Sequence, residues 1–186
     1  MTTDERILDL AERLVQTRGF NGFSYADIAA SLGVTKASLH YHFPAKAALG
    51  KSLIGRYERN FLAALEAIDA KVKSPREKLR RYAGINAGVL ADGRMCLCGM
   101  LAAEYATLPK AMQQELRHFF AENERWLAAV LEDGQRAGEL EFAGSPREVA
   151  SLLVSSLEGA MMLARSHGSV KRFRALAERL VAGLAA

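Results

Sequence analysis

The sequence predicts an all-α fold of about nine helices, and three observations support this prediction. Long stretches rich in Ala, Leu, Glu and Arg, all good helix formers, are interrupted by only four prolines in 186 residues. Alternating runs of Val, Ile, Thr and aromatic residues bounded by tight turns, as a sheet requires, are missing. Half of the residues are apolar, which is enough for a packed core.

The first helix is expected over residues 4–17, where apolar side chains recur at every third or fourth position. Thr3 is its expected N-cap, and Gly19 is expected to end it. Two shorter helices follow, over residues 25–32 and 36–42. Ser24, followed three positions later by an acid, favours the start of one, and Thr35 caps the other.

A long helix is expected over residues 46–71, where it can bridge two modules. Ser-Pro pairs, typical of helix starts, then begin two of the later helices. We expect a helix-turn-helix DNA-binding domain over residues 1–46 and a helical ligand-binding and dimerisation domain over residues 47–186. The expected helices of the second domain after the long one cover residues 75–91, 95–107, 109–137, 146–167 and 169–184.

Charge and cysteine content favour a cytoplasmic protein. The formal net charge of +4 suits an acidic partner such as DNA without identifying one. The N-terminal segment mixes acids and bases where a secretory signal needs an apolar core, and no window of about eighteen residues is apolar enough for a membrane span. Cys96 and Cys98 are too close together to join distant parts of a fold, as disulfides in secreted proteins do.

Residues 24–43, SYADIAASLGVTKASLHYHF, have the pattern of a helix-turn-helix. Such a motif needs a small residue where its two helices touch, a glycine in the turn and an apolar residue after it. Ala29 or Ala30, Gly33 and Val34 supply these three features. The apolar residues expected to face inward are Ile28, Leu32 and Leu39, against Ile7, Leu10, Leu14 and Phe20 of the first helix.

Residues 18–49, RGFNGFSYADIAASLGVTKASLHYHFPAKAAL, resemble the N-terminal DNA-binding domain of the TetR/AcrR family of repressors. The Gly-Phe turn, the I-A-x-x-x-G-V core, the K-A-S-L-x-Y-x-F helix and the following lysine all fall in order. His40 stands where tyrosine is more usual, and Ala47 where an acid often follows the lysine, so the base preference stays open. The resemblance implies a ligand-responsive repressor that binds a palindromic operator as a dimer and is released by a small molecule.

The resemblance implies contacts with double-stranded DNA from the third helix. Thr35, Ser38 and Tyr41 would bond phosphate oxygens, and Lys46 would add charge beside the positive end of a helix dipole. Base edges would be contacted by Lys36 and its neighbours Ala37 and His40. Phe43 is expected in the core. The expected DNA-binding residues are Ser24, Tyr25, Thr35, Lys36, Ala37, Ser38, His40, Tyr41, His42 and Lys46.

The later helices hold more apolar residues than a bridging segment needs, so we expect a second core. Their flexible and aromatic side chains are of the kind that line ligand pockets, although the same residues would also suit a packed interior. A small effector bound there would shift the helix over residues 46–71 and so change the separation of the DNA-binding heads. The candidate effector-binding residues are Tyr82, Met95, Met100, Leu101, Tyr105, Phe119, Trp126, Met161 and Met162.

The last two helices are the expected homodimer interface. An apolar run over residues 149–163 contains small residues that permit close helix approach, and the last helix carries a matching apolar stripe. A symmetric dimer would set its two recognition helices roughly 34–36 Å apart, one DNA turn, which predicts a palindromic operator.

Four alternatives involve other sites or other functions. Cys96 or Cys98, near Arg94 and a helix start, is a candidate redox- or electrophile-sensing thiol, or both are small buried hydrophobes. On a helix, two residues so spaced point about 200° apart, and no His or Asp cluster completes a tetrahedral site, so no metal site is expected. No cofactor is expected either. No GxxxxGKS, GxSxG or HExxH motif occurs, so an enzyme is not expected. A helical adaptor that binds only proteins is the remaining alternative.

Overall fold

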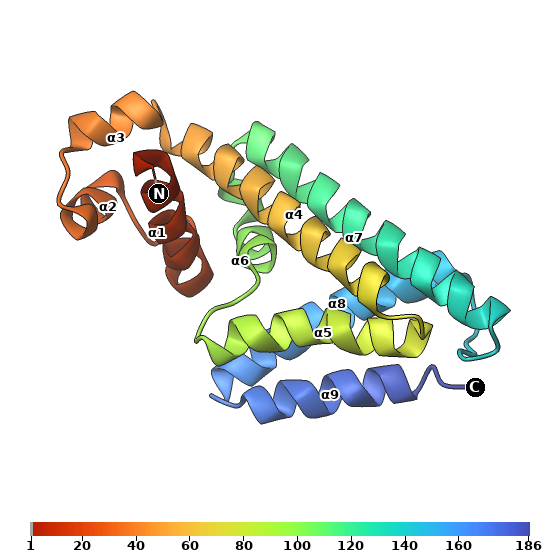
Figure 1. The fold of residues 1–186 in the computed structure, drawn as a ribbon. Coiled ribbons are helices and arrows are strands. Elements are labelled where there is room, and N and C mark those ends of the chain that lie inside the picture. Colours follow the sequence, from red (N-terminus) through yellow and green to blue (C-terminus); the bar gives the residue numbers. More distant parts are fainter. Residues whose placement is uncertain (1) are drawn as a thin grey trace. The chain divides into compact units, whose positions relative to one another are not determined.

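The structure is a computed structural model and describes residues 2–186. These residues form nine α-helices and one short 3-10 helix, with an isolated β-bridge between Leu140 and Ala185 and no strand (Figure 1). The predicted all-α fold class is confirmed. None of the helices in the described part of the chain combines the length and hydropathy that a membrane-spanning segment requires.

The helices, in chain order, are α1 (Thr3–Arg18), α2 (Tyr25–Leu32), α3 (Lys36–His42), α4 (Lys46–Lys71), α5 (Pro75–Ala91), α6 (Leu97–Ala103), η1 (Tyr105–Thr107), α7 (Lys110–Arg136), α8 (Pro146–Ser166) and α9 (Val170–Ala182).

Side-chain caps explain where most of these helices begin. The hydroxyls of Ser74 and Ser145 accept hydrogen bonds from N–H groups in the first turns of α5 and α8. Each serine is followed by a proline at the first helical position, as predicted. The N-cap of α1 is Thr2 and not Thr3. The Thr2 hydroxyl accepts the Glu5 N–H at 3.3 Å, while the Glu5 carboxylate accepts the Thr2 N–H at 2.6 Å, and this reciprocal pair fixes the helix start.

The single helix predicted over residues 95–107 is wrong. Cys96 precedes α6 as its N-cap, so the two cysteines do not lie on one continuous helix. The helix ends at Ala103, and a separate 3-10 turn, η1, follows Glu104. The carboxylate of Glu104 bonds to backbone groups more than eighty residues away, so tertiary contacts override a locally favourable helix here.

The chain divides into two compact units, each with its own core. Unit 1 consists of the residues up to Asn60 together with Cys96–Phe119. Within it, α1 contacts both α2 and α6, and α2 contacts α3. Its fully buried residues come from every helix of the unit. The short helices α2 and α3 therefore pack against a shared core. They include Ile7 and Ala11 of α1, Ile28 of α2, Leu39 of α3, Leu53 and Ile54 of α4, and Leu97 of α6.

Unit 2 consists of Phe61–Met95 and Phe120–Ala186. Within it, α5, α8 and α9 lie side by side (Figure 1), and each of the three contacts the other two. Phe173 of α9 is completely buried among them, as is Met161 of α8. The expected second core is therefore present.

The helix α4 runs without a break through the division between the units, which falls after Asn60. The predicted boundary between a DNA-binding domain over residues 1–46 and a ligand-binding domain over residues 47–186 is a division by function, and it stays a prediction.

Candidate nucleic-acid interface

Local hydrogen bonds explain why α2 and α3 form two short helices joined by a tight turn. The Asp27 carboxylate accepts bonds from the hydroxyl and the backbone N–H of Ser24, both at 2.7 Å, and these bonds lower the pKa of Asp27 from its usual value. Gly33 ends α2 with a φ of 67°, in the left-handed region that favours glycine. The Thr35 hydroxyl accepts the Ser38 N–H at 3.1 Å and starts α3.

One face of each short helix is buried. Ile28 and Ala29 of α2 and Leu39 of α3 are buried, and the Val34 N–H closes the turn by donating to the Ala29 carbonyl at 3.1 Å. Of the two alanines proposed for the small contact position, Ala29 is the buried one, while Ala30 is exposed. Since α3 uses so few residues for packing, most of its side chains remain on the surface.

The outward face of α3 consists of polar and aromatic side chains. Tyr41 is 86% exposed, so its ring contributes almost nothing to the packing of the monomer. Ser38 and His42 are half-buried. The exposed residues of this face are Thr35, Lys36, Ala37, His40 and Tyr41.

Tyr25 and His40 hold each other in place at the edge of this face. The Tyr25 hydroxyl donates to the Phe43 carbonyl at 2.8 Å, and its ring lies 4.9 Å from the His40 ring, centre to centre. Burial raises the pKa of Tyr25. The Nδ1 atom of His40 lies 3.1 Å from the Pro44 carbonyl, which can only accept, so Nδ1 is the donor in this contact, and in the matching neutral tautomer Nε2 is an acceptor.

His42 faces α1 and not the outward surface of α3. Its Nδ1 pairs with the Asp4 carboxylate, and its ring meets the Tyr41 ring edge to face at 5.3 Å. This pair ties the end of α3 to the start of α1 and orients the Tyr41 ring.

Lys46 is half-buried and packs against other residues of unit 1. Its ammonium group donates to the backbone carbonyls of Phe20 and Phe23, and it sits over both aromatic rings, 4.6 and 4.2 Å from their centres. Burial lowers the pKa of Lys46, and the nearby carboxylates of Glu104 and Asp27 act in the opposite direction. These contacts explain Lys46 without DNA, and its predicted phosphate contact stays a prediction.

Glu104 is a positioning residue that sequence reasoning missed. Its carboxylate accepts the N–H groups of Phe20 at 2.6 Å and Asn21 at 3.2 Å, while the Asn21 amide donates to the Thr107 hydroxyl at 2.8 Å. Gly19 lies beneath it with a φ of 83°, and a Cβ there would be only 2.9 Å from a carboxylate oxygen. The turn between α1 and α2 is thus held by Glu104 on one side and by Lys46 on the other.

Half of the predicted DNA-binding residues surround one recess of about 380 Å³ at the start of α2. Two of its lining side chains are lysines and none is acidic, which suits an anionic partner. The recess is lined by Phe23, Ser24, Tyr25, Ala26, Lys36, His40 and Lys46.

The predicted effector-binding residues divide between the two units. In unit 2, the hydroxyl of Tyr82 donates to the Asn123 amide oxygen at 3.0 Å, its ring stacks on Trp126 at 5.8 Å, and the Trp126 N–H donates to Asp69 at 2.8 Å. Met95 and Met161 are buried there, whereas Met162 is 47% exposed.

In unit 1, Leu101 and Phe119 are buried, and the Phe119 ring lies 5.6 Å from that of Tyr57. Met100 and Tyr105 are half-buried, and the Tyr105 hydroxyl accepts a hydrogen bond from Arg117. Their role in effector binding stays a prediction.

Both cysteines are buried, and neither forms a disulfide. The sulfur of Cys96 accepts the Gly99 N–H at 3.4 Å, and the Tyr57 hydroxyl donates to the same sulfur at 3.8 Å. Cys98 is completely buried.

Comparison with known proteins identifies the family. Residues 7–53 match the family model of the bacterial regulatory proteins of the tetR family, and residues 78–180 match that of the tetracyclin repressor-like C-terminal domain. The chain belongs to the TetR family. A TetR-family regulator of known structure from Agrobacterium tumefaciens is 35% identical with a TM-score of 0.95, over 98% of this chain and 97% of that one.

Two further relatives of this TetR-family regulator are named proteins. The HTH-type transcriptional repressor DhaR of Mycobacterium sp. (strain GP1) is 26% identical over 85% of this chain and 80% of its own length. The nucleoid occlusion factor SlmA of Cronobacter sakazakii is 30% identical over 94% of this chain and 87% of its own length. The predicted helix-turn-helix regulator is thereby confirmed, while its individual DNA contacts stay predictions.

Proposed function

We propose that this TetR-family regulator is a homodimeric repressor that binds a palindromic operator through α3 and leaves it when a small molecule binds. The observation that carries the proposal is the outward face of α3, where Lys36, His40 and Tyr41 are exposed and make little or no contribution to the core. Amine, imidazole and hydroxyl groups are those that bond to phosphates and base edges. The relative DhaR is named a repressor, which supports this direction of control.

The residues of α3 divide by the contacts that their chemistry allows. Thr35, Ser38 and Tyr41 bond phosphate oxygens and position the helix. Lys36 donates to guanine acceptors in the major groove, and the Nε2 atom of neutral His40 accepts from the amino group of adenine or cytosine. Because Nδ1 of His40 is already bonded to the Pro44 carbonyl, the acceptor atom is the one left available.

The uncovered apolar faces of α8 and α9 support dimerisation through these two helices. Leu152, Met162 and Leu163 of α8 are 61%, 47% and 51% exposed, and Leu176 of α9 is 38% exposed. Gly159 lies among them on α8, and a Cβ there would meet nothing within 4 Å. A second copy would cover these side chains in a four-helix interface, and its two-fold symmetry requires a palindromic operator.

The effector is proposed to bind among α5, α7 and α8, where Tyr82, Asn123 and Trp126 combine aromatic walls with buried polar atoms. Such a site suits a largely apolar molecule with one or two hydrogen-bonding groups. Because α4 passes unbroken through both units, a displacement of its second half is transmitted to the segment that begins at Lys46.

The test begins with selection of binding sequences from random duplex DNA, followed by titration of the selected operator. Lys36→Ala is expected to weaken binding by about 1–3 kcal/mol, or roughly 5- to 150-fold. Lys110 is also exposed and lies at the start of α7, so Lys110→Ala is the matched control and should bind like the parent protein. Failure to enrich any sequence would favour a helical adaptor, and equal binding by Lys36→Ala would exclude α3 as proposed.

A second candidate, a thiol-sensing repressor, is favoured by the environment of Cys96. Two donors, the Gly99 N–H and the Tyr57 hydroxyl, point at its sulfur, and Cys96 stands at the N-terminus of α6. Treatment with N-ethylmaleimide should then abolish operator binding by the parent protein and by Cys98→Ala, but not by Cys96→Ala. If the folded protein is not alkylated, or if the Cys96→Ala variant is inactivated equally, this candidate is excluded.

A further inference from the structure

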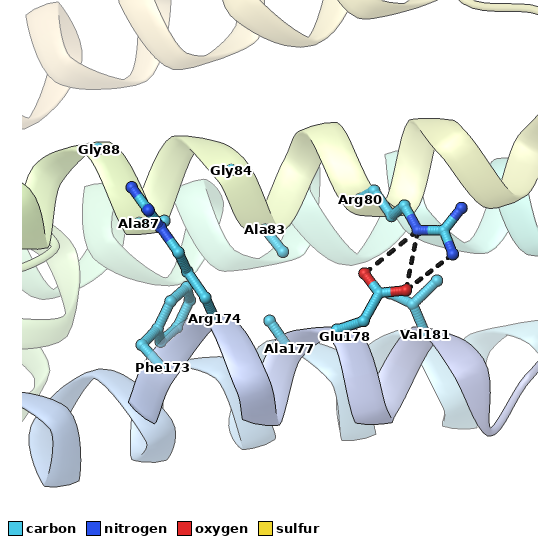
Figure 2. A pocket seen from close by; sticks show the side chains of 10 residues that line it. All are labelled: Arg80, Ala83, Gly84, Ala87, Gly88, Phe173, Arg174, Ala177, Glu178 and Val181. Atoms are coloured by element: carbon cyan, nitrogen blue, oxygen red, sulfur yellow. Dashed lines mark hydrogen bonds and ion pairs between the residues drawn. The ribbon is translucent and has the colours of Figure 1, made fainter. Parts of the chain in front are cut away.

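A groove between α5 and α9 in unit 2 takes no part in the proposed function. Its volume is about 400 Å³, within the range of about 300–1,000 Å³ that small-molecule sites occupy. One wall is the small-residue face of α5, and the other is formed by Phe173, Ala177 and Val181 of α9. Figure 2 shows Ala83 and Ala177 facing each other across the open middle of this groove.

The α5 wall is kept open by two glycines that the fold does not require. Gly84 and Gly88 lie inside a helix, where glycine is the least favourable residue after proline. Neither has the positive φ that would call for glycine, and a Cβ at either position would meet nothing within 4 Å. Their missing side chains leave space that the monomer itself does not fill.

Charged groups stand at the two ends of the apolar groove. At one end, the Arg80 guanidinium holds the Glu178 carboxylate with Nε at 3.1 and 3.2 Å and with a terminal nitrogen at 2.7 Å. At the other end, Arg174 reaches from α9 toward Ala87 of α5 (Figure 2). Arg174 forms no ion pair or hydrogen bond with any residue in the described part of the chain. The groove therefore carries an unmatched positive charge.

We infer that this groove binds a small carboxylate with a linear apolar chain. The carboxylate pairs with Arg174, whose planar fork of donors matches its two oxygens as Arg80 already matches Glu178. The chain lies between Ala83 and Ala177 and extends toward the Arg80–Glu178 pair. The eight helical steps from Arg80 to Gly88 span about 12 Å, a length that accommodates such an extended chain. The inference does not depend on DNA binding.

The experiment uses three probes with the same apolar chain, namely octanoate, octanol and octylamine, added to the full-length protein without DNA. Methyl NMR of labelled alanine and valine reports directly on the groove through Ala83, Ala87, Ala177 and Val181. Octanoate should shift the methyl signals of these four residues and bind about ten-fold more tightly than octanol, because the alcohol cannot form the charge-assisted pair with Arg174. Octylamine should bind more weakly still.

Variants locate the headgroup and the chain separately. Arg174→Ala should weaken octanoate binding about ten-fold, whereas Arg172→Ala, an exposed arginine on the same helix outside the groove, should leave it unchanged. Gly84→Leu fills the groove and should abolish binding, and it should fold because its Cβ meets open space and leucine favours helix. Three results would overturn the inference. Octanoate could leave the groove methyl signals unchanged, or bind Arg174→Ala or Gly84→Leu as tightly as the parent protein. It could also bind no more tightly than octylamine.

Discussion

The carboxylate of Glu104 fixes the turn between α1 and α2, and Glu104→Gln tests how strongly. The carboxylate accepts two backbone N–H groups and lies near the ammonium of Lys46. Glutamine keeps one carbonyl oxygen but turns an NH₂ donor toward the second N–H. It also removes the negative charge that faces Lys46.

The expected loss follows from these contacts. Hydrogen bonds to charged groups contribute about 1.5–3 kcal/mol each, against about 1 kcal/mol for neutral ones. Glu104→Gln loses one such bond and weakens the other, so the free energy of unfolding should fall by about 2 kcal/mol. For a chain of this size, that corresponds to a decrease in Tm of about 4–8 °C.

Thermal unfolding measures the global effect, and amide hydrogen exchange at Phe20 and Asn21 measures the local one. The matched control is Glu115→Gln, because Glu115 pairs with Lys51 at 3.3 Å near the surface and should contribute less than about 1 kcal/mol. The positioning role of Glu104 is refuted if Glu104→Gln has the same Tm as this control and the two amides exchange no faster than in the parent protein.

Three further predictions concern the cap of α2, its turn and the dimer. The pKa of Asp27 is lowered in the folded state, so its stabilising contribution is present above its unfolded pKa of about 4 and is lost as the pH falls through the folded pKa. The Tm of Asp27→Asn should therefore decrease less on acidification than the Tm of the parent protein. Gly33→Ala should lower the unfolding free energy in urea by about 1 kcal/mol, since a Cβ there meets only open space and the backbone strain alone is costly. Leu152→Glu should convert the dimer into a folded monomer in sedimentation, and an unchanged mass would argue against an interface on α8.

Local signals in the sequence were sufficient to predict most of the fold. Ser74 and Ser145, each followed by proline, fix helix starts through contacts within one turn. The left-handed glycine at Gly33 likewise depends only on its own turn. The outward face of α3 followed from the same local pattern, because burial of Leu39 determines which side chains of a short helix remain exposed.

Features that depend on distant residues could not be predicted in this way. Glu104 and its backbone partner Phe20 lie 84 residues apart, and no spacing in the sequence indicates their contact. This contact follows directly after the end of α6, where helical propensity alone predicted a longer helix. Lys46 was expected to face DNA, yet its ammonium lies over the rings of Phe20 and Phe23. The Gly84 face of α5 forms a groove only together with α9, and the sequence does not indicate that these two helices are neighbours.

The central claim is that the outward face of α3 binds DNA, and Tyr41→Ala tests it most directly. Tyr41 is 86% exposed, so its removal should change the free energy of unfolding by no more than about 0.5 kcal/mol. Titration of the selected operator with both proteins, followed by fluorescence anisotropy, should show at least about five-fold weaker binding by the variant, as expected for a lost hydrogen bond to a phosphate. Equal affinity of the two folded proteins would contradict the account.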